Sequence, residues 1–178
     1  MAWRGLGPAL AVWAVALGPA AAAETRTGTV EFVADGDTAF VQAGAGRRLK
    51  CRLAGIDAPE VSHPRRAGGQ TPGQPYGLEA KRALETWALR RRVTVEVYGR
   101  DTYRRPLCVL HAGGRNLNLD LVREGLAWVE HGRGVDAPPS LRRELVAAER
   151  EARSARRGLW ANGNPEPPWQ FRKRARVR

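Results

Sequence analysis

Cysteine and histidine are scarce in this chain of 178 residues. Two cysteines exclude a disulfide-rich scaffold and a cysteine-based zinc module. Three histidines can supply little of a histidine-based metal site. The chain also lacks an internal repeat and any long low-complexity segment. At this length the sequence predicts one domain rather than two.

Acidic residues are outnumbered, with 18 Asp and Glu against 30 Lys and Arg, which gives a formal net charge of +12. Lysine is rare as well: Lys50, Lys81 and Lys173 are the only three, so arginine supplies the other 27 basic residues. The hydrophobic content of 43% and the six tryptophans can build a core, which argues against wholesale disorder. The excess charge predicts a polyanionic partner, either nucleic acid or an anionic membrane surface.

The first 23 residues resemble an export signal. They carry one charge, Arg4, then an apolar stretch at 6–17 and small residues at 21–23. This order is typical of a secretory signal peptide, so we expect a periplasmic or secreted protein. An uncleaved membrane anchor is the alternative, because residues 5–23 are uncharged and nearly long enough to span a bilayer. Cleavage after Ala23 would leave 155 residues, with no later stretch able to span.

The remaining chain alternates between strand and helix patterns. Strands are predicted at 29–32, 38–41, 47–53, 93–98 and 107–111. Helices are predicted at 79–91, near 119–125 and over 141–155. Residues 55–76 are predicted to be irregular, and residues 162–178 are a Pro-rich, basic tail.

This order of elements is that of the five-stranded Greek-key barrel called the OB-fold. We therefore expect an α+β, mainly β, domain over residues 24–161, with an OB-fold barrel and three helices. The fold often binds nucleic acid, in agreement with the charge. We expect a monomer with no obligate protein partner.

Three turns carry the side chains that could perform chemistry, at 35–38, 52–60 and 101–105. Each alone is compatible with an ordinary solvated turn. Together they offer carboxylates, which are the oxygen ligands of Ca²⁺ or Mg²⁺, and arginines, which bind phosphate through paired hydrogen bonds. A carboxylate that does not bind metal can activate water. The set is sufficient for phosphodiester hydrolysis.

In these and neighbouring segments the chain resembles the staphylococcal nuclease (thermonuclease-like) family. The matching segments are VADGDT at 33–38, RLAGIDAPE at 52–60, HPRR at 63–66, YGLEA at 76–80, DTYRRPL at 101–107 and LVREGLA at 121–127. GLWA at 158–161 and PPW at 167–169 resemble bacterial members. The resemblance implies a Ca²⁺-dependent phosphodiesterase on an OB barrel, which cuts DNA and RNA and leaves 3′-phosphates.

The resemblance also implies a metal site. Asp37 and Asp57 match the Ca²⁺-binding aspartates of the family. Ala58 stands where the family usually has threonine, whose backbone carbonyl contributes to the metal site. Alanine has the same carbonyl, so we expect metal binding to be kept.

Catalytic and substrate-binding roles follow from the same resemblance. Glu60 matches the glutamate assigned as general base, and Arg52 and Arg105 match the two catalytic arginines. Tyr103 matches a tyrosine near the bound phosphate. A family tyrosine that stacks on the base falls near His131 here, which places base preference in question.

The two cysteines flank the candidate arginines. By strand alternation Cys51 points opposite to Arg52, and Cys108 points opposite to Arg105. OB topology puts the third and fifth strands side by side, so both thiols could meet inside the barrel. One hypothesis is a disulfide between them, which export to an oxidising compartment would favour. Two buried free thiols are the alternative.

Other classes of function remain as rivals. A non-catalytic OB-fold protein that binds single-stranded nucleic acid would explain the charge but has no need of the carboxylates. A protein of the membrane or peptidoglycan surface would explain charge and export, again without the carboxylates. The basic tail is expected either to hold phosphates or to be a solvated terminus.

Overall fold

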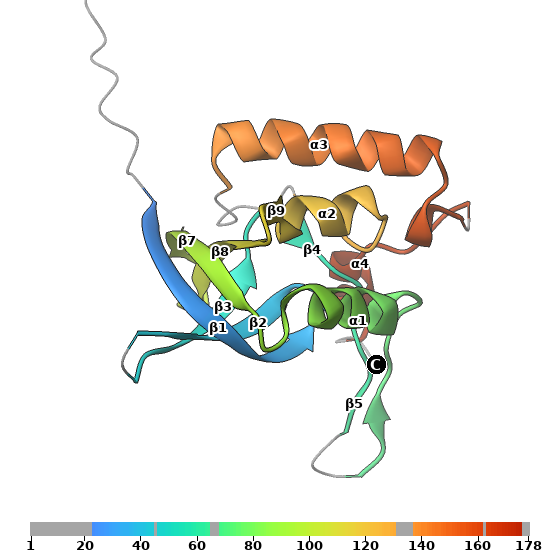
Figure 1. The fold of residues 1–178 in the computed structure, drawn as a ribbon. Coiled ribbons are helices and arrows are strands. Elements are labelled where there is room, and N and C mark those ends of the chain that lie inside the picture. The colour runs from blue at the N-terminus through green and yellow to red at the C-terminus, as the bar shows by residue number, and fades with distance from the viewer. Residues whose placement is uncertain (1–22, 45, 65–67, 131–136, 162, 176–178) are drawn as a thin grey trace, which may run out of the picture.

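The structure is a computed structural model that describes residues 23–44, 46–64, 68–130, 137–161 and 163–175 (Figure 1). The predicted signal peptide, apart from Ala23, and His131 lie outside the described residues. No helix in the described ranges is long and apolar enough to cross a membrane.

Five strands build a closed barrel. They are β1 (Glu24–Asp35), β2 (Thr38–Ala43), β3 (Arg48–Leu53), β7 (Arg92–Arg100) and β8 (Pro106–Ala112). Neighbours in the order β3-β2-β1-β7-β8 are antiparallel, and parallel pairing of β3 with β8 closes the sheet. The expected α+β fold with an OB-type barrel is confirmed.

The first strand is much longer than predicted. Its first half pairs with β7 and its second half with β2, so one bent strand serves both sides of the barrel (Figure 1). The residues at 24–29 are mostly polar and exposed, so hydrophobic alternation gave no signal there. Backbone pairing with β7 makes this segment a strand.

Short strands complete the sheet structure. They are β4 (Ile56–Asp57) with β10 (Trp128–Val129), β5 (His63–Pro64) with β6 (Gln70–Thr71), and β9 (Arg115–Asn116) beside β8. The β5–β6 pair lies in the segment predicted to be irregular. The β4–β10 pair matters for the site, because it pairs Asp57 with Trp128 and brings Glu130, which follows β10, to the same side of the molecule as Asp57.

The helices pack around the barrel, with α2 and α3 side by side in Figure 1. They are α1 (Gly77–Ala88), α2 (Leu117–Arg123), α3 (Pro139–Ser154), the 3₁₀ turn η1 (Gly158–Ala161) and α4 (Pro168–Ala175). The first three match the predicted helices, whereas α4 was missed. It is short and basic, with only Pro168 buried, so it lacks the apolar periodicity that identifies a helix.

The barrel is fastened where β3 meets β8. Cys51 and Cys108 form a disulfide with a Cα–Cα distance of 5.6 Å, and both residues are fully buried. The buried side chain of Asn118 adds three hydrogen bonds: it donates to the carbonyls of Ala54 and Cys108 and accepts from the amide of Leu110. Of the two alternatives left open by the sequence, the disulfide is the one present, and it ties together the two strands next to the candidate arginines.

Candidate active site

One polar cavity of about 810 Å³ collects the candidate residues at the edge of the barrel. It lies between the β1–β2 turn, β3, the chain after β4, the β7–β8 turn and α4. Seven of the eight residues expected at the site line it: Asp37, Arg52, Asp57, Ala58, Glu60, Tyr103 and Arg105. The eighth, His131, is not among the described residues.

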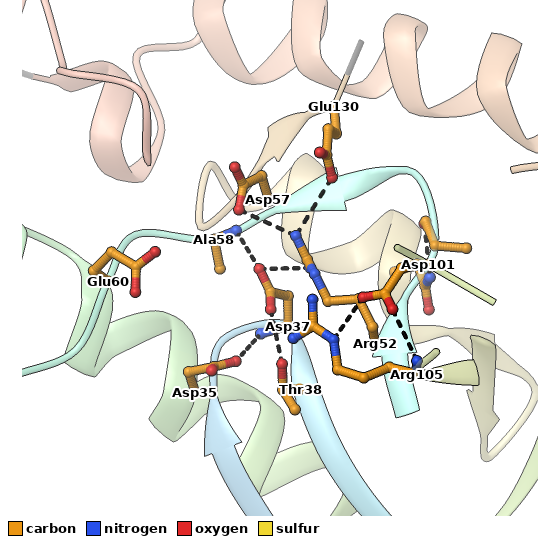
Figure 2. A network of polar contacts seen from close by, with 12 residues as sticks. Asp35, Asp37, Thr38, Arg52, Asp57, Ala58, Glu60, Asp101, Arg105 and Glu130 are labelled. Carbon is orange, nitrogen blue, oxygen red and sulfur yellow. Dashed lines mark hydrogen bonds and ion pairs between the residues drawn. The ribbon is translucent and has the colours of Figure 1, made fainter. Parts of the chain in front are cut away.

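Arg52 is the centre of a buried ionic network (Figure 2). Its Nη1 lies 2.7 Å from Oδ2 of Asp37. Its Nη2 lies 3.1 Å from Oδ1 of Asp57 and 3.4 Å from Oε2 of Glu130. Burial lowers the pKa of the guanidinium, but the three carboxylates outweigh it and raise the pKa of Arg52. The charge of this arginine is thus fixed, and its position is set by three partners.

Asp37 is held at the end of the tight β1–β2 turn. Its Oδ2 accepts a hydrogen bond of 2.7 Å from the amide of Ala58, and its Oδ1 accepts one of 3.1 Å from the hydroxyl of Thr38 (Figure 2). Burial, together with the neighbouring carboxylate of Asp35, raises the pKa of Asp37 to about 6, against the opposing effect of Arg52. The cavity therefore disfavours its negative charge and would favour an added cation.

The pKa values of two further carboxyl groups in the cavity are also raised. Burial raises the pKa of Asp57, although Arg172 and Arg52 oppose it. Burial also raises the pKa of Glu130, against the effect of Arg52. The arginines present do not fully compensate the desolvation of these carboxyls.

Glu60 stands beside this network rather than within it (Figure 2). Its backbone is clamped by Gln74: the amide of Glu60 donates to the side-chain oxygen of Gln74, and its carbonyl accepts from the amide of Gln74. Gly77 at the start of α1 packs so closely that a Cβ there would lie 2.3 Å from the carbonyl oxygen of Glu60. These contacts hold the backbone of Glu60 in place, while its side chain is 30% exposed.

Arg105 is held by a single acidic residue in the β7–β8 turn. Asp101 accepts from the Nε of Arg105 at 2.6 Å, and from the backbone amides of Arg105 and Tyr103 at 2.8 and 2.9 Å. Burial raises the pKa of Asp101, but these hydrogen bonds outweigh the effect of burial and lower the pKa. The ring of Tyr103 is 72% exposed, with the guanidinium of Arg105 5.5 Å from its centroid. Arg104 adopts a positive φ of 63° here, a conformation unfavourable for a side chain.

Two residues of the cavity were missed by sequence reasoning. Glu130 directly follows β10, and only its place after a short apolar pair could have drawn attention to it. Arg172 of α4 binds Asp57 through Nη2–Oδ2 at 2.7 Å and Nη1–Oδ1 at 3.1 Å, and its Nη1 also lies 2.8 Å from Oε1 of Glu60. Nothing in the row of basic residues of the tail distinguished Arg172 from its neighbours.

The donor set fits a hard divalent cation of the kind that the resemblance implies. Asp37 and Asp57 offer buried carboxylate oxygens, and Ala58, which follows Asp57 and also lines the cavity, has a backbone carbonyl. Within the described ranges, no group of three or more His, Cys, Asp or Glu side chains converges as a complete metal site. A cation here would complete its coordination with water or substrate oxygens, as Ca²⁺ and Mg²⁺ do. In this structure the guanidinium of Arg172 places a positive charge next to Asp57, as a bound metal ion would.

The fold and this cavity define an OB-type barrel whose rim presents carboxylates and arginines suited to a metal ion and a phosphate. The family model described as "Staphylococcal nuclease homologue" matches residues 50–162. The chain belongs to this family. Asp37 and Arg172 both fall outside the matched range.

Curated proteins give the same family. The chain is 38% identical over 130 residues to a "Probable staphylococcal-like nuclease CAN4" of Oryza sativa subsp. japonica, which covers 73% of this chain. It is 32% identical over 154 residues to an "Uncharacterized endonuclease" of Haemophilus influenzae, covering 86% of this chain and 77% of that protein. A protein of the same description from Escherichia coli O157:H7 is 34% identical over 148 residues, covering 83% of this chain and 85% of that one.

The plant relatives are much longer than this chain. The matched region spans 23% of the rice protein and 33% of an "Uncharacterized 38.1 kDa protein" of Capnoides sempervirens. The two bacterial relatives are matched over most of their length.

Proposed function

We propose that the chain is a phosphodiesterase, an endonuclease that hydrolyses DNA and RNA with Ca²⁺ as its cofactor and leaves 3′-phosphate ends. The observation that carries this proposal is the convergence of three carboxylates and two arginines on one cavity: Asp37, Asp57, Glu60, Arg52 and Arg105. Membership of the family and the names of the bacterial relatives support the reaction class.

The metal would be held by Asp37, Asp57 and the backbone carbonyl of Ala58. When bound, Ca²⁺ would neutralise charge on the scissile phosphate and polarise one of its oxygens. The pKa of Asp37, raised to about 6 by burial, fits a carboxylate that awaits a cation.

Glu60 would act as the general base. Its carboxylate would accept a proton from water while the water oxygen forms a bond to phosphorus and the bond from phosphorus to the 5′ oxygen breaks. The 5′ oxygen takes up a proton and leaves as a hydroxyl, so the phosphate stays on the 3′ oxygen. Arg52 and Arg105 would stabilise the charge that builds up on the phosphate oxygens in the five-coordinate transition state.

A non-catalytic protein that binds single-stranded nucleic acid is the rival function. The same barrel and positive charge would serve it. It has no use for carboxylates in the cavity, because they repel phosphate, so Asp37, Asp57 and Glu60 favour the enzyme.

The deciding experiment incubates the purified protein with heat-denatured DNA and with RNA, in Ca²⁺ or in chelator. We expect degradation only with Ca²⁺, and products that accept a new 5′-phosphate from a kinase and release phosphate from their 3′ ends with a phosphatase. Intact substrate in Ca²⁺ would exclude the enzyme and favour the binding protein. Full activity of Glu60→Gln would exclude Glu60 as the base.

We also propose that residues 1–23 direct export and are removed, which gives a periplasmic or secreted enzyme. The mass of the protein recovered from expressing cells tests this. A chain that begins at Glu24 supports the proposal, whereas a membrane-bound chain of all 178 residues would establish the N-terminal anchor instead.

A further inference from the structure

The outer face of β1, β2 and β3 carries two aromatic rings and a lysine in one row. Phe32 of β1 pairs with Phe40 of β2, and Phe40 pairs with Lys50 of β3. Paired residues on neighbouring antiparallel strands point to the same face. Ala39 and Val41, on either side of Phe40, are fully buried in the barrel. Phe32, Phe40 and Lys50, which we call the aromatic row, therefore face outward.

Three cations surround the two rings of this row. The guanidinium of Arg48 lies 4.6 Å from the centroid of Phe40, and the amine of Lys50 lies 5.7 Å from it. The amine of Lys81, on α1, lies 5.5 Å from the centroid of Phe32. The ring centroids are 5.7 Å apart; Phe32 is 47% exposed and Phe40 is half-buried. Aromatic rings at the surface with cations close to them are the combination that binds single-stranded nucleic acid.

Two carboxylates reach the same surface. Glu31 lies 3.4 Å from Arg48, with both side chains about half exposed, and Glu85 lies 3.9 Å from Lys81. Pairs this exposed are weak. They therefore leave the cations available to a phosphate.

The aromatic row is continuous with the active-site cavity. Lys50 lines the cavity and lies two residues before Arg52 on β3, so the two side chains emerge on the same face. Thr38, two residues before Phe40 on β2, pairs with Arg52. The row thus lies one step of about 7 Å along the strands from the catalytic arginine. Arg48 lies one step further.

We propose that a single-stranded segment of the substrate, leaving the cavity, binds along the aromatic row. This inference rests on the proposed nuclease function. Bases stack on Phe40 and Phe32, while the phosphates between them contact Lys50 and Arg48. A paired duplex cannot offer the faces of its bases, so the row gives the enzyme a preference for single strands over duplex.

The test compares a substrate that reaches the row with one that does not. A single-stranded 12-mer can extend from the cavity over β2, whereas a dinucleotide fills the cavity alone. For Phe40→Leu, which keeps an apolar side chain but removes the aromatic face, we expect KM for the 12-mer to rise about tenfold. The kcat for the 12-mer and the kinetics of the dinucleotide should not change. Phe40→Trp should restore the wild-type KM.

Charge is tested separately, with a matched control. Lys50→Gln should raise KM for the 12-mer and reduce the slope of log KM against log salt by about one. Arg143→Gln, which removes one charge from an exposed position on α3, should leave that slope unchanged. An unchanged KM in Phe40→Leu, or an equal rise with a duplex 12-mer, would overturn the proposal. A wild-type protein that cleaves neither substrate would instead overturn the proposed function.

A separate observation concerns Arg172, whose guanidinium takes both oxygens of Asp57 and one oxygen of Glu60. A metal ion on Asp57 needs at least one of those oxygens, and a general base needs its carboxylate free. In the described part of the tail, Pro168 is also buried, and the carbonyl of Glu166 accepts a hydrogen bond of 2.9 Å from Gln74. Docking of α4 and binding of a cation thus compete for the same oxygens.

The geometry points to α4 as an internal latch, which we infer is released when a divalent cation binds. The inference rests on the proposed metal site. In the latched state Arg172 satisfies Asp57 and Glu60, and metal must displace it. Coupling between two binding events is reciprocal, so removal of Arg172 must strengthen metal binding by the factor by which metal weakens docking of the tail.

Calcium binding without substrate tests the latch. By titration calorimetry we expect Arg172→Gln to bind Ca²⁺ about tenfold more tightly than the wild type, within the usual range of coupling between sites. Arg174→Gln is the matched control, because this neighbour pairs with Glu166 rather than with the cavity, and its affinity should equal that of the wild type. Hydrogen exchange over residues 168–175 should quicken when Ca²⁺ is added to the wild type.

Equal or weaker Ca²⁺ binding in Arg172→Gln would overturn the latch, as would hydrogen exchange in α4 that Ca²⁺ leaves unchanged. Absence of Ca²⁺ binding in both proteins would overturn the latch together with the proposed metal site.

Discussion

Arg52 and Arg105 belong to the same proposed chemistry, yet the fold holds them in opposite ways. Arg52 comes from the barrel strand β3, is 10% exposed, and meets three carboxylates that lie far apart in the sequence. Arg105 comes from a turn, is 29% exposed, and meets one carboxylate four residues earlier. The difference separates a charge that the whole fold positions from one that a local turn positions.

This contrast follows from where the partners come from. The partners of Arg52 arrive on the β1–β2 turn, on β4 and after β10, so its position depends on the closed barrel. Asp101 needs only the β7–β8 turn, in which it also accepts two backbone amides. Removal of Arg52 should therefore affect both stability and chemistry, whereas removal of Arg105 should affect chemistry alone.

The largest effect is expected for Arg52→Gln. It leaves Asp37 buried without its cation and leaves Asp57 with Arg172 alone, and breaking a buried ion pair costs about 3–5 kcal/mol. We expect kcat to fall by roughly 10³-fold, as for loss of a preorganised charge donor. Urea unfolding and kinetics on single-stranded DNA measure the two losses. An unchanged free energy of unfolding in Arg52→Gln would mean that Arg52 is not positioned by the whole fold, in contrast to Arg105.

Arg105→Gln should lower kcat by about 10²-fold while the free energy of unfolding changes by no more than about 1 kcal/mol, because the ion pair is only partly buried and Asp101 keeps its hydrogen bonds from two backbone amides. Its KM should change far less than its kcat, since a transition-state contact acts on turnover. Equal losses in binding and turnover would make Arg105 a simple phosphate contact.

The disulfide joins β3, which carries Arg52, to β8, which begins directly after Arg105. Cys51 precedes Arg52, and Cys108 follows Arg105 by three residues. The bond closes a loop of 57 residues, for which chain entropy predicts a loss of about 4 kcal/mol when it is removed. We expect Cys51→Ala/Cys108→Ala to lower the unfolding midpoint in urea while kcat at 25 °C falls less than in Arg105→Gln. A larger loss of activity would show that the spacing of the two arginines depends on the covalent link.

The same contrast decides how much the sequence could predict. The barrel, three helices and the local turn of Arg105 follow from hydrophobic alternation and from short motifs. Glu130 and Arg172 did not, because each reaches the cavity through tertiary packing, after β10 and on α4. The length of β1 was also missed, since polar residues at 24–29 are held by pairing with β7 rather than by burial.

The smallest effect is expected in the pH dependence of stability, where the partners of the two arginines should act with opposite sign. Burial raises the pKa of Asp37 to about 6 in the metal-free protein, so the folded state keeps a proton that the unfolded chain has released above about pH 4. A state that binds more protons loses stability as the pH rises. Through Asp37, the free energy of unfolding should therefore fall as the pH rises from about 4 to about 6.

The pKa of Asp101 is lowered by its hydrogen bonds from Arg105 and Tyr103, so its contribution is present above about pH 4 and is lost on further acidification. Urea unfolding across pH 3–7 in chelator, for the wild type, Asp37→Asn and Asp101→Asn, separates the two. Because Asp57 and Glu130 also have raised pKa values, the informative quantity is the difference between each variant and the wild type. We expect the Asp37→Asn difference to change between about pH 4 and 6, and the Asp101→Asn difference only below about pH 4. Differences that change over the same pH range would show that the two carboxylates share one environment, and that the contrast between the fixed and the local arginine does not extend to their partners.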